Sequence, residues 1–306
     1  MNLQFEHALV ALDQSEASDI IVDCLGHFEK FGTKKITLFT SVSVPYPGGL
    51  SSSIEQKYKT QNENYRERLQ KSGYEVQTEV SFKINAYAPA RIIEAAKEIG
   101  VDFVIIANRG YNKYREFLLG STATELLQRS HLPVYLINLT VSDESELENR
   151  KLFCKKACKD SLDHIFYPTD FSTTSGRAFN VLKQLAPGHT KRVSLLHVQA
   201  TGRPGMNDPK KLQAFDRTDT ERLKELKTEL EEVTDAKVFV KVRYGSPVKQ
   251  ILENSESDEA TMILIGSQGR GYVSDLFMGG VCHQVIRKSH IPVLTIPADR
   301  DREEVP

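Results

Sequence analysis

The chain has 306 residues, with 40 basic and 41 acidic side chains and a formal net charge of −1. This length allows two domains of roughly 100 to 150 residues, and the balanced charge argues against a nucleic acid or an anionic membrane as partner, while leaving a local phosphate site open. No segment approaches the roughly 18 consecutive apolar residues of a membrane span, and Met1 leads into a strand-like pattern instead of a signal peptide, so we expect a cytoplasmic protein.

The first half predicts strands that alternate with helices. Apolar Ala8–Leu12 predicts a strand ending at Asp13, and Ser15 and Ser18 offer caps for a following helix. The remaining predicted elements of this half are a strand at Ile36–Val42, a charged helix ending at Leu69, a strand at Val76–Ile84, a helix from Pro89, a strand at Val101–Ala107, a helix at Gly120–Arg129 and a strand at Val134–Ile137.

The second half repeats this order, with Asp170 again following the first strand. Its predicted elements are a strand at Ile165–Tyr167, a helix at Thr173–Leu185, a strand at Val193–Val198, a charged helix at Leu212–Glu232 with a core stripe of Leu223, Leu226 and Leu230, a strand at Lys237–Val242, a helix from Pro247, a strand at Met262–Ile265, a helix after the next glycine segment and a strand at Val293–Ile296.

Such alternation indicates βαβ units and a parallel sheet covered on both faces. We therefore predict an α/β fold of two tandem, five-stranded, doubly wound sandwiches. Domain 1 spans residues 1–140 and domain 2 spans residues 161–306. A linker at residues 141–160, rich in Ser, Glu, Asp and Lys, joins them, and its apolar spacing allows part of it to be helical.

An internal repeat supports the two-domain prediction. Nine residues separate Gly110 from Gly120 and also Gly269 from Gly279, and each segment closes on a Ser-His-x-Pro-Val phrase. The same 159 positions separate Gly110 from Gly269 and Gly120 from Gly279. This period is the size of a domain and not of a solenoid repeat.

The glycine segments and the two aspartates follow strands whose carboxyl ends meet at one edge of each sheet, where open α/β sheets bind ligands. Glycine lets backbone N–H groups approach an anion, and a helix N-terminus adds donors and a positive dipole end, so phosphate is the expected ligand group. Neither a Walker A loop nor the dinucleotide G-x-G-x-x-G spacing is present. Simple turn geometry is the alternative explanation of these glycines.

These residues resemble the universal stress protein family in its tandem-domain form. Its nucleotide-binding branch carries Gly, two residues, Gly, nine residues, Gly and Ser/Thr, after an Asp-containing loop. The second half has Gly266-Ser267-Gln268-Gly269 followed by Gly279, and the first has Ala107-Asn108-Arg109-Gly110 followed by Gly120-Ser121. The resemblance covers nearly the whole chain apart from the linker and tails.

The resemblance implies an adenine nucleotide alpha hydrolase-like fold and a cytoplasmic, regulatory or stress-response protein that binds ATP or ADP in at least one half, with or without Mg²⁺. It implies at most slow hydrolysis, with no catalytic residue and no metal ligand assigned. The implied nucleotide-binding residues are Asp13, Val42, Ala107, Gly110, Gly120 and Ser121 in the first half, and Asp170, Val198, Gly266, Gly269, Gly279 and Gly280 in the second.

Each half departs once from the family motif. Ala107 replaces the first glycine of the first copy, which is harmless if its φ is negative, and Gly280 replaces the expected Ser/Thr of the second. These departures support the alternative of a ligand-free interaction scaffold of the same fold. An adenylating ligase of a related fold is a third reading, disfavoured because no further catalytic motif appears.

The resemblance also implies that domains pair edge to edge through their last strands. We expect Val134–Ile137 to pair with Val293–Ile296 within one chain and to relate the two domains by a pseudo-twofold axis, because exposed apolar edges would aggregate. A homodimer stays open.

Several cysteines and histidines have competing interpretations. The four cysteines lack the spacing of a disulfide framework, which predicts reduced thiols, and a solvated linker helix is favoured over a metal or redox site for Cys154 and Cys158. A structural turn is favoured over catalysis for His131 and His290. A packed strand-end position is favoured over a ligand neighbour for His197.

Overall fold

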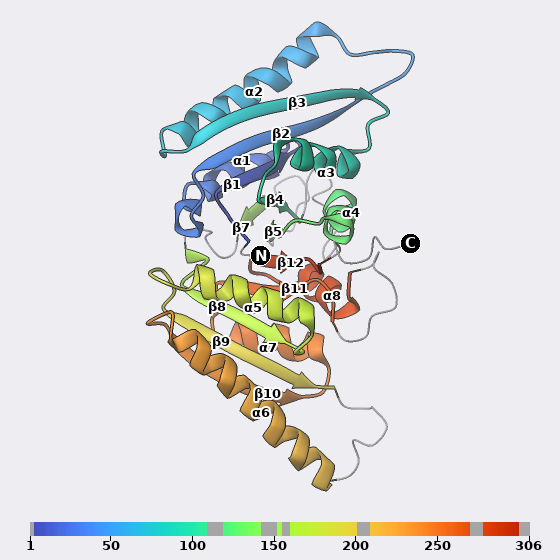
Figure 1. Cartoon of the computed structure of the whole chain (residues 1–306). Coiled ribbons are helices and arrows are strands. Elements are labelled where there is room, and N and C mark those ends of the chain that lie inside the picture. The colour runs from blue at the N-terminus through green and yellow to red at the C-terminus, as the bar shows by residue number, and fades with distance from the viewer. Residues whose placement is uncertain are drawn as a thin grey trace, which may run out of the picture. The chain divides into compact units, whose positions relative to one another are not determined.

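The computed structural model describes residues 3–108, 119–141, 152–154, 160–200, 209–269 and 278–299. Its contacts divide the chain into two compact units, unit 1 up to Lys159 and unit 2 from Asp160. Each unit contains a five-stranded parallel sheet with helices on both faces, which confirms the predicted α/β class (Figure 1).

The sheet of unit 1 has the strand order β3-β2-β1-β4-β5. Its strands are β1 (His7–Leu12), β2 (Lys35–Val44), β3 (Glu75–Ile84), β4 (Phe103–Ala107) and β5 (Val134–Ile137). Its helices are α1 (Glu16–Leu25), the short 3₁₀ helix η1 (Phe28–Phe31), α2 (Ser52–Gln70), α3 (Ala88–Ile99) and α4 (Ser121–Arg129).

The sheet of unit 2 repeats this arrangement in the order β10-β9-β8-β11-β12. Its strands are β8 (His164–Thr169), β9 (Arg192–Gln199), β10 (Lys237–Tyr244), β11 (Met262–Gly266) and β12 (Val293–Ile296). Its helices are α5 (Thr173–Leu185), α6 (Pro209–Glu231), α7 (Pro247–Ser257) and α8 (Gly280–Lys288).

The strand order determines which helices share a face. Crossovers between parallel strands are right-handed. The helices that connect β1, β2 and β3 (α1 and α2) therefore cover one face of the sheet, and those that lead to β4 and β5 (α3 and α4) cover the other. The same rule separates α5 and α6 from α7 and α8 in unit 2. Accordingly α3 packs beside α4, and α7 beside α8 (Figure 1). The central strands are therefore covered twice, and every residue of β4 and β11 is buried.

The described part of the linker differs from the expected helix. β6 (Leu139–Val141) and β7 (Leu152–Cys154) form a two-stranded antiparallel sheet in unit 1, so Cys154 lies in a strand. Cys154 and Cys282 are reduced thiols, whereas Cys24 of α1 is disulfide-bonded, so the expectation of four reduced thiols is wrong for Cys24. Cys158 lies outside the described residues.

Candidate functional site

Each sheet has a switch point, where the chain direction across the sheet reverses, between β1 and β4 in unit 1 and between β8 and β11 in unit 2. Asp13 and Asp170 directly follow β1 and β8. Asn108 follows β4, and Gly266 ends β11. The predicted aspartates and the start of each glycine segment thus lie at the position where open α/β sheets bind ligands.

Asp170 and Gly269 are brought together in unit 2. A Cβ added to Gly269 would lie 2.6 Å from Asp170 Oδ2, so any other residue here would displace this carboxylate. The other carboxylate oxygen, Oδ1, accepts a hydrogen bond from the backbone N–H of Ser172 at 3.0 Å. Ser172 caps α5 by accepting from Ser175 N at 3.2 Å. The aspartate therefore has a fixed orientation between a helix N-terminus and the glycine segment.

Gly266 is required for close packing and not for an unusual backbone angle. A Cβ at this position would lie 3.1 Å from the backbone N of Ser175 and 3.1 Å from two atoms of Thr174. In unit 1 the matching strand end is Ala107, and the matching helix position carries the smaller Ala17 in place of threonine. Ala107 is absent from the residues with positive φ in the described chain, so its Cβ meets the condition under which the substitution is harmless.

Gly120 and Gly279 close their glycine segments in the same way. Each is the N-cap of the following helix, with φ −59° in both. Gly120 N–H donates to Asn108 O at 2.8 Å, and Gly279 N–H donates to Ser267 O at 2.8 Å. Both helices therefore begin beside the strand that precedes them, and their first N–H groups lie at the switch point.

Ser121 and Gly280 occupy the first helical positions. No atom within 4 Å would oppose a Cβ at Gly280, so the absent hydroxyl leaves open space and no distortion. Gly110 lies outside the described residues.

The aspartate loops of the two units share an unusual backbone. Gln14 and Phe171, which follow Asp13 and Asp170, both have φ 58° although neither is glycine. In unit 1, Asp13 Oδ1 accepts from Ser15 N at 3.0 Å, from Ser15 Oγ at 2.6 Å and from Ser18 Oγ at 3.2 Å. Non-glycine residues in this region cost free energy and concentrate at functional sites.

The strand register corrects the correspondence between the second strands. Leu12 lies opposite Thr40 and Thr169 lies opposite His197, so Val42 corresponds to Gln199. Val198 instead corresponds to Ser41, and its side chain points to the opposite face from that of Gln199. Val42 is buried and Val198 is half-buried. That either valine borders a ligand stays a prediction.

Buried polar side chains behind these strands differ between the units, and the sequence interpretation did not include most of them. In unit 1, Asn62 of α2 is fully buried and bonds to Gln14 and Thr40. In unit 2 the corresponding Asp219 of α6 lies 3.4 Å from His197 Nε2 and accepts from Gln199 Nε2 at 2.9 Å. An uncharged cluster in one unit is thus replaced by an ionisable pair in the other.

His197 is a packed strand-end residue, as predicted. Its Nδ1 donates to the carbonyl oxygen of Thr169 at 2.7 Å, because a carbonyl can only accept. The ring of Phe171 lies on it at 4.6 Å between centroids, and the guanidinium of Arg222 lies 3.9 Å from the centre of the Phe171 ring. These contacts tie the Asp170 loop to α6.

His131 and His290 lie at the amino ends of the strands, just before β5 and β12 begin and opposite the carboxyl ends that form the switch point. Both are exposed, and serine organises each turn: Ser130 Oγ donates to Leu132 O at 2.9 Å, and Ser289 Oγ donates to Ile291 O at 2.8 Å. The predicted structural turn is therefore present, and it lies away from the switch point.

The amino ends of the strands in unit 2 also carry a buried histidine network. His164 Nε2 lies 3.0 Å from Ser194 Oγ, which donates to Asp258 Oδ2 at 2.8 Å. Because this hydroxyl donates to the carboxylate, it accepts the Nε2 proton of His164. Burial, followed by the positive charge of Arg192, lowers the pKa of His164 from 6.5 to about 4. Lys241 pairs with the other oxygen of Asp258.

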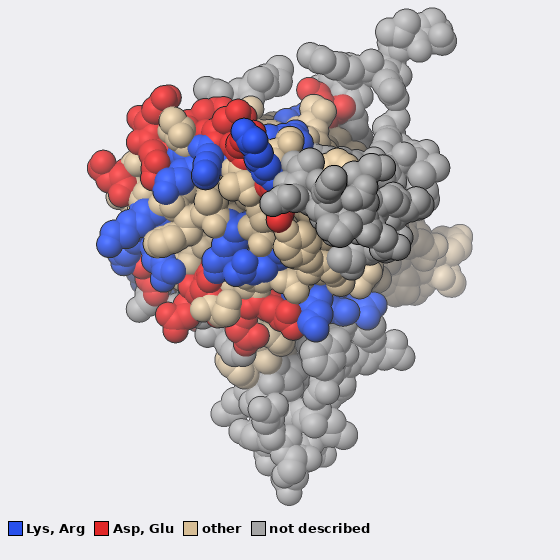
Figure 2. Space-filling view, turned by 90° about the horizontal axis from the view of Figure 1, so that it is seen from below, with Lys and Arg blue, Asp and Glu red and all other residues tan. Residues whose placement is uncertain are grey.

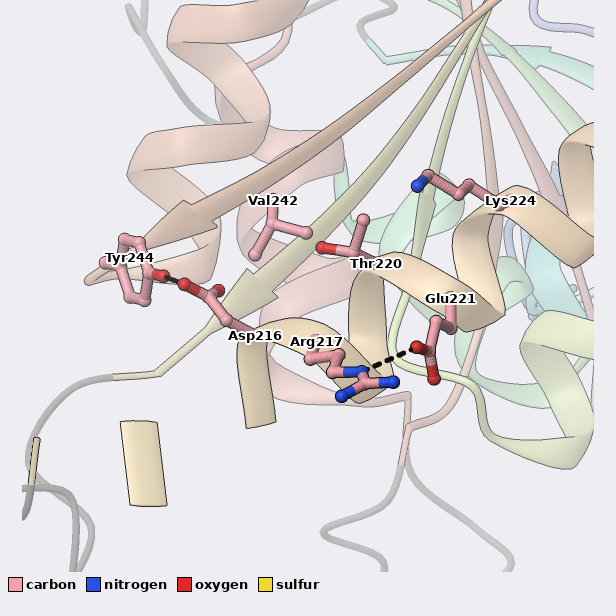
Figure 3. Close-up of a pocket in the computed structure, with 7 residues that line it drawn as sticks. All are labelled: Asp216, Arg217, Thr220, Glu221, Lys224, Val242 and Tyr244. Carbon is pink, nitrogen blue, oxygen red and sulfur yellow. Dashed lines mark hydrogen bonds and ion pairs between the residues drawn. The ribbon is translucent and has the colours of Figure 1, made fainter. Parts of the chain in front are cut away.

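A shallow groove of about 470 Å³ is formed by residues of α6 and of the edge strand β10 (Figure 3). It is lined by Asp216, Arg217, Thr220, Glu221, Lys224, Val242 and Tyr244. Several of its polar groups bond to one another: Arg217 Nε donates to Glu221 at 2.9 Å, and the Tyr244 hydroxyl donates to Asp216. None of the predicted nucleotide-binding residues lines this groove.

Surface charge on one face and metal-ligand chemistry among the described residues add no second candidate site. On the face shown in Figure 2, basic and acidic side chains are interspersed, so the face has no field of one sign. No group of three or more His, Cys, Asp or Glu side chains that suits a metal ion occurs among the residues described. Within the same residues, no helix has both the length and the apolar content needed to cross a bilayer.

Comparison with known proteins agrees with the duplicated fold. The universal stress protein family model matches residues 4–138 and 161–297. Universal stress protein MJ0577 of Methanocaldococcus jannaschii is 30% identical over 153 residues, covering 43% of this chain and 93% of the relative. A universal stress protein of Mycolicibacterium smegmatis is 26% identical over 308 residues, covering 94% and 96%. The crystal structure of a universal stress protein from Archaeoglobus fulgidus aligns with a TM-score of 0.63 and 21% identity over 98% of both chains.

Proposed function

Because the chain belongs to the universal stress protein family, we propose that it binds an adenine nucleotide, ATP or ADP, in at least one of its two units. The binding site in each unit would be the switch point between the aspartate loop and the glycine segment. The nucleotide would act as a regulatory ligand that alters a partner surface, with hydrolysis at most slow.

One observation carries this proposal: the same arrangement occurs at both switch points. In each unit an aspartate follows the first strand, a positive-φ residue follows the aspartate, and a glycine N-cap is hydrogen-bonded back to the end of the fourth strand. Two helices therefore direct their N-termini to one place in each unit, which suits a phosphate group.

The residues of unit 2 fit such a ligand. Gly269 lets the Asp170 carboxylate lie against the glycine segment, and Gly279 places the first turn of α8 next to Ser267. Asp170 is oriented to accept hydrogen bonds, as a ribose hydroxyl would require. Any Mg²⁺ would be held mainly by the phosphates, since the described residues offer no ready metal cluster.

A ligand-free scaffold is the competing function, and its support came from Ala107 and Gly280. Ala107 has no left-handed backbone to strain, and Gly280 faces open space, so neither substitution obstructs a ligand. We also propose that β5 pairs with β12 between the two units. A cytoplasmic location is a further part of the nucleotide-binding proposal.

Native mass spectrometry of freshly purified protein, followed by calorimetric titration with ATP–Mg and ADP, tests the proposal. Asp13→Asn and Asp170→Asn keep an acceptor oxygen for Ser15 and Ser172 and remove the charge, so each should weaken binding in its own unit without unfolding it. Glu253→Gln, which removes one charge from the exposed face of α7 and lies outside the proposed site, is the matched control. Protein shown to be free of retained ligand that binds neither nucleotide would refute the proposal.

A further inference from the structure

The small β6–β7 sheet contacts the candidate site of unit 1 at two separate points. β6 directly follows β5, and β7 pairs with it antiparallel, with Leu139 opposite Cys154 and Val141 opposite Leu152. The sheet belongs to the stretch that connects the two units, yet its described residues are bonded to the switch point of unit 1.

The first contact is made by Asn108. Its side-chain Oδ1 accepts from Leu139 N–H at 2.9 Å, and its Nδ2 donates to Leu139 O at 3.3 Å. One amide thus satisfies both backbone groups of Leu139, as a neighbouring strand would. The backbone oxygen of Asn108 also accepts from Gly120 N–H at 2.8 Å. A single residue therefore holds both β6 and the N-terminus of α4.

The second contact is made by Glu16, the first residue of α1. Its Oε1 accepts from Leu152 N–H at 3.1 Å, and Leu152 is 6% exposed. Glu16 lies three positions after Asp13, on the aspartate side of the switch point. The β6–β7 sheet is consequently bonded to the glycine side through Asn108 and to the aspartate side through Glu16.

Unit 2 provides the natural contrast. Ser267 corresponds to Asn108 and makes the same backbone bonds, from its N–H to Ile296 O at 2.8 Å and from Gly279 N–H to its carbonyl oxygen at 2.8 Å. A serine hydroxyl cannot reproduce the paired donor and acceptor of an amide. No counterpart of the β6–β7 sheet occurs among the described residues of unit 2.

We propose that docking of the β6–β7 sheet and nucleotide occupancy of unit 1 are thermodynamically linked, with Asn108 as the positioning residue. This inference rests on the proposed function. A nucleotide at the N-terminus of α4 favours one placement of Gly120, Gly120 is bonded to Asn108, and Asn108 holds β6. Linkage is reciprocal, so a docked sheet strengthens nucleotide binding and a bound nucleotide stabilises the docked sheet. The connecting stretch thereby reports the ligand state of unit 1 and not that of unit 2.

Hydrogen exchange of the full chain, titrated with ATP–Mg, tests the linkage because peptides from α4 and α8 report the two units separately. In the wild-type protein, ATP–Mg should slow exchange at Leu139 and Leu152 with the same midpoint as in α4. Asn108→Ser, which gives unit 1 the residue of unit 2, should abolish this slowing and weaken the α4 midpoint about fivefold or more, while the α8 midpoint stays unchanged. Asn108→Asp keeps the acceptor for Leu139 N–H but cannot donate, so its effect should be intermediate.

Glu16 supplies an independent pair of variants if Asn108→Ser fails to fold. Glu16→Ala removes the acceptor of Leu152 N–H and should weaken the α4 midpoint in the same direction, whereas Glu16→Gln retains an acceptor oxygen and should not. Protection of α4 with a wild-type midpoint, in variants whose β6–β7 amides exchange freely, would overturn the linkage alone. Absence of ATP-dependent protection in both α4 and α8 of the wild-type protein would instead overturn the proposed function, and the linkage with it.

Discussion

The contact between Gly266 and the first turn of α5 can be tested by adding one methyl group. In Gly266→Ala the new Cβ would lie 3.1 Å from Ser175 N, from Thr174 C and from Thr174 Cγ2, whereas ordinary van der Waals contact begins near 3.4 Å. Two of these atoms belong to the backbone of a helix, which cannot move aside like a flexible side chain. Overpacking of this kind typically costs about 1–3 kcal/mol, so we expect unit 2 to lose that much stability.

The assay must separate the units, because a two-unit chain does not unfold in a single two-state step. Native-state hydrogen exchange at β11 amides reports the opening free energy of unit 2, and β4 amides serve as the internal reference. Thermal unfolding should show a midpoint lowered by about 2–4 °C for each kcal/mol lost. Gly280→Ala, which meets no atom within 4 Å, is the matched control and should change stability little.

A second substitution separates the side-chain contact from the backbone contacts. Thr174→Ala removes Cγ2, one of the three close atoms, and gives unit 2 the alanine pair found in unit 1 as Ala107 and Ala17. Adding Thr174→Ala to Gly266→Ala should recover part of the lost stability, but not all of it. If Gly266→Ala proves as stable as Gly280→Ala, the close-packing explanation of this glycine is wrong.

Three further predictions concern other parts of the molecule. Folding lowers the pKa of His164 from 6.5 to about 4, so its stabilising contribution is complete above pH 6.5 and is lost as the pH falls toward 4, by at most about 3 kcal/mol; urea midpoints of unit 2 should drop between pH 7 and 4.5, and less so in His164→Gln. Gly269→Ala should displace the Asp170 carboxylate, so it should weaken nucleotide binding in unit 2 while changing the thermal midpoint little; an unchanged affinity in calorimetric titration would contradict this. Leu223→Ala should cost about 2–5 kcal/mol in urea unfolding, because Leu223 is fully buried, and equal losses for half-buried Leu226→Ala would contradict this difference.

Much of the fold follows from patterns within short stretches of the sequence. Apolar runs such as Phe103–Ala107 predict buried strands because both faces of a central strand are covered. The glycine that closes each glycine segment predicts a helix N-terminus at the switch point, and Gly120 and Gly279 are indeed N-caps. These features depend on local chemistry, which a single sequence reveals.

The missed features depend on contacts between distant residues. β7 has three residues, too few for a periodic signal. Only the strand register shows that it pairs with β6, with Leu139 opposite Cys154. The pairing of His197 with Asp219 joins a strand to a helix whose register against the sheet no local pattern specifies. The mismatch of Val42 and Val198 has the same origin, because a shift of one residue along a strand exchanges its two faces. Asp219 is one of several acidic residues of α6, so the sequence alone does not distinguish it from the solvated face of the helix.

The hydrogen bond from Gly120 to Asn108, and its twin from Gly279 to Ser267, makes the intervening stretch an exchangeable cassette. Because one backbone hydrogen bond joins the two ends of the stretch, the strand before it and the helix after it are held together independently of the residues between them. Lengthening such a closed stretch costs little, about 0.6 kcal/mol for each doubling. The two stretches can therefore differ in sequence and in length while the two cores keep the same arrangement.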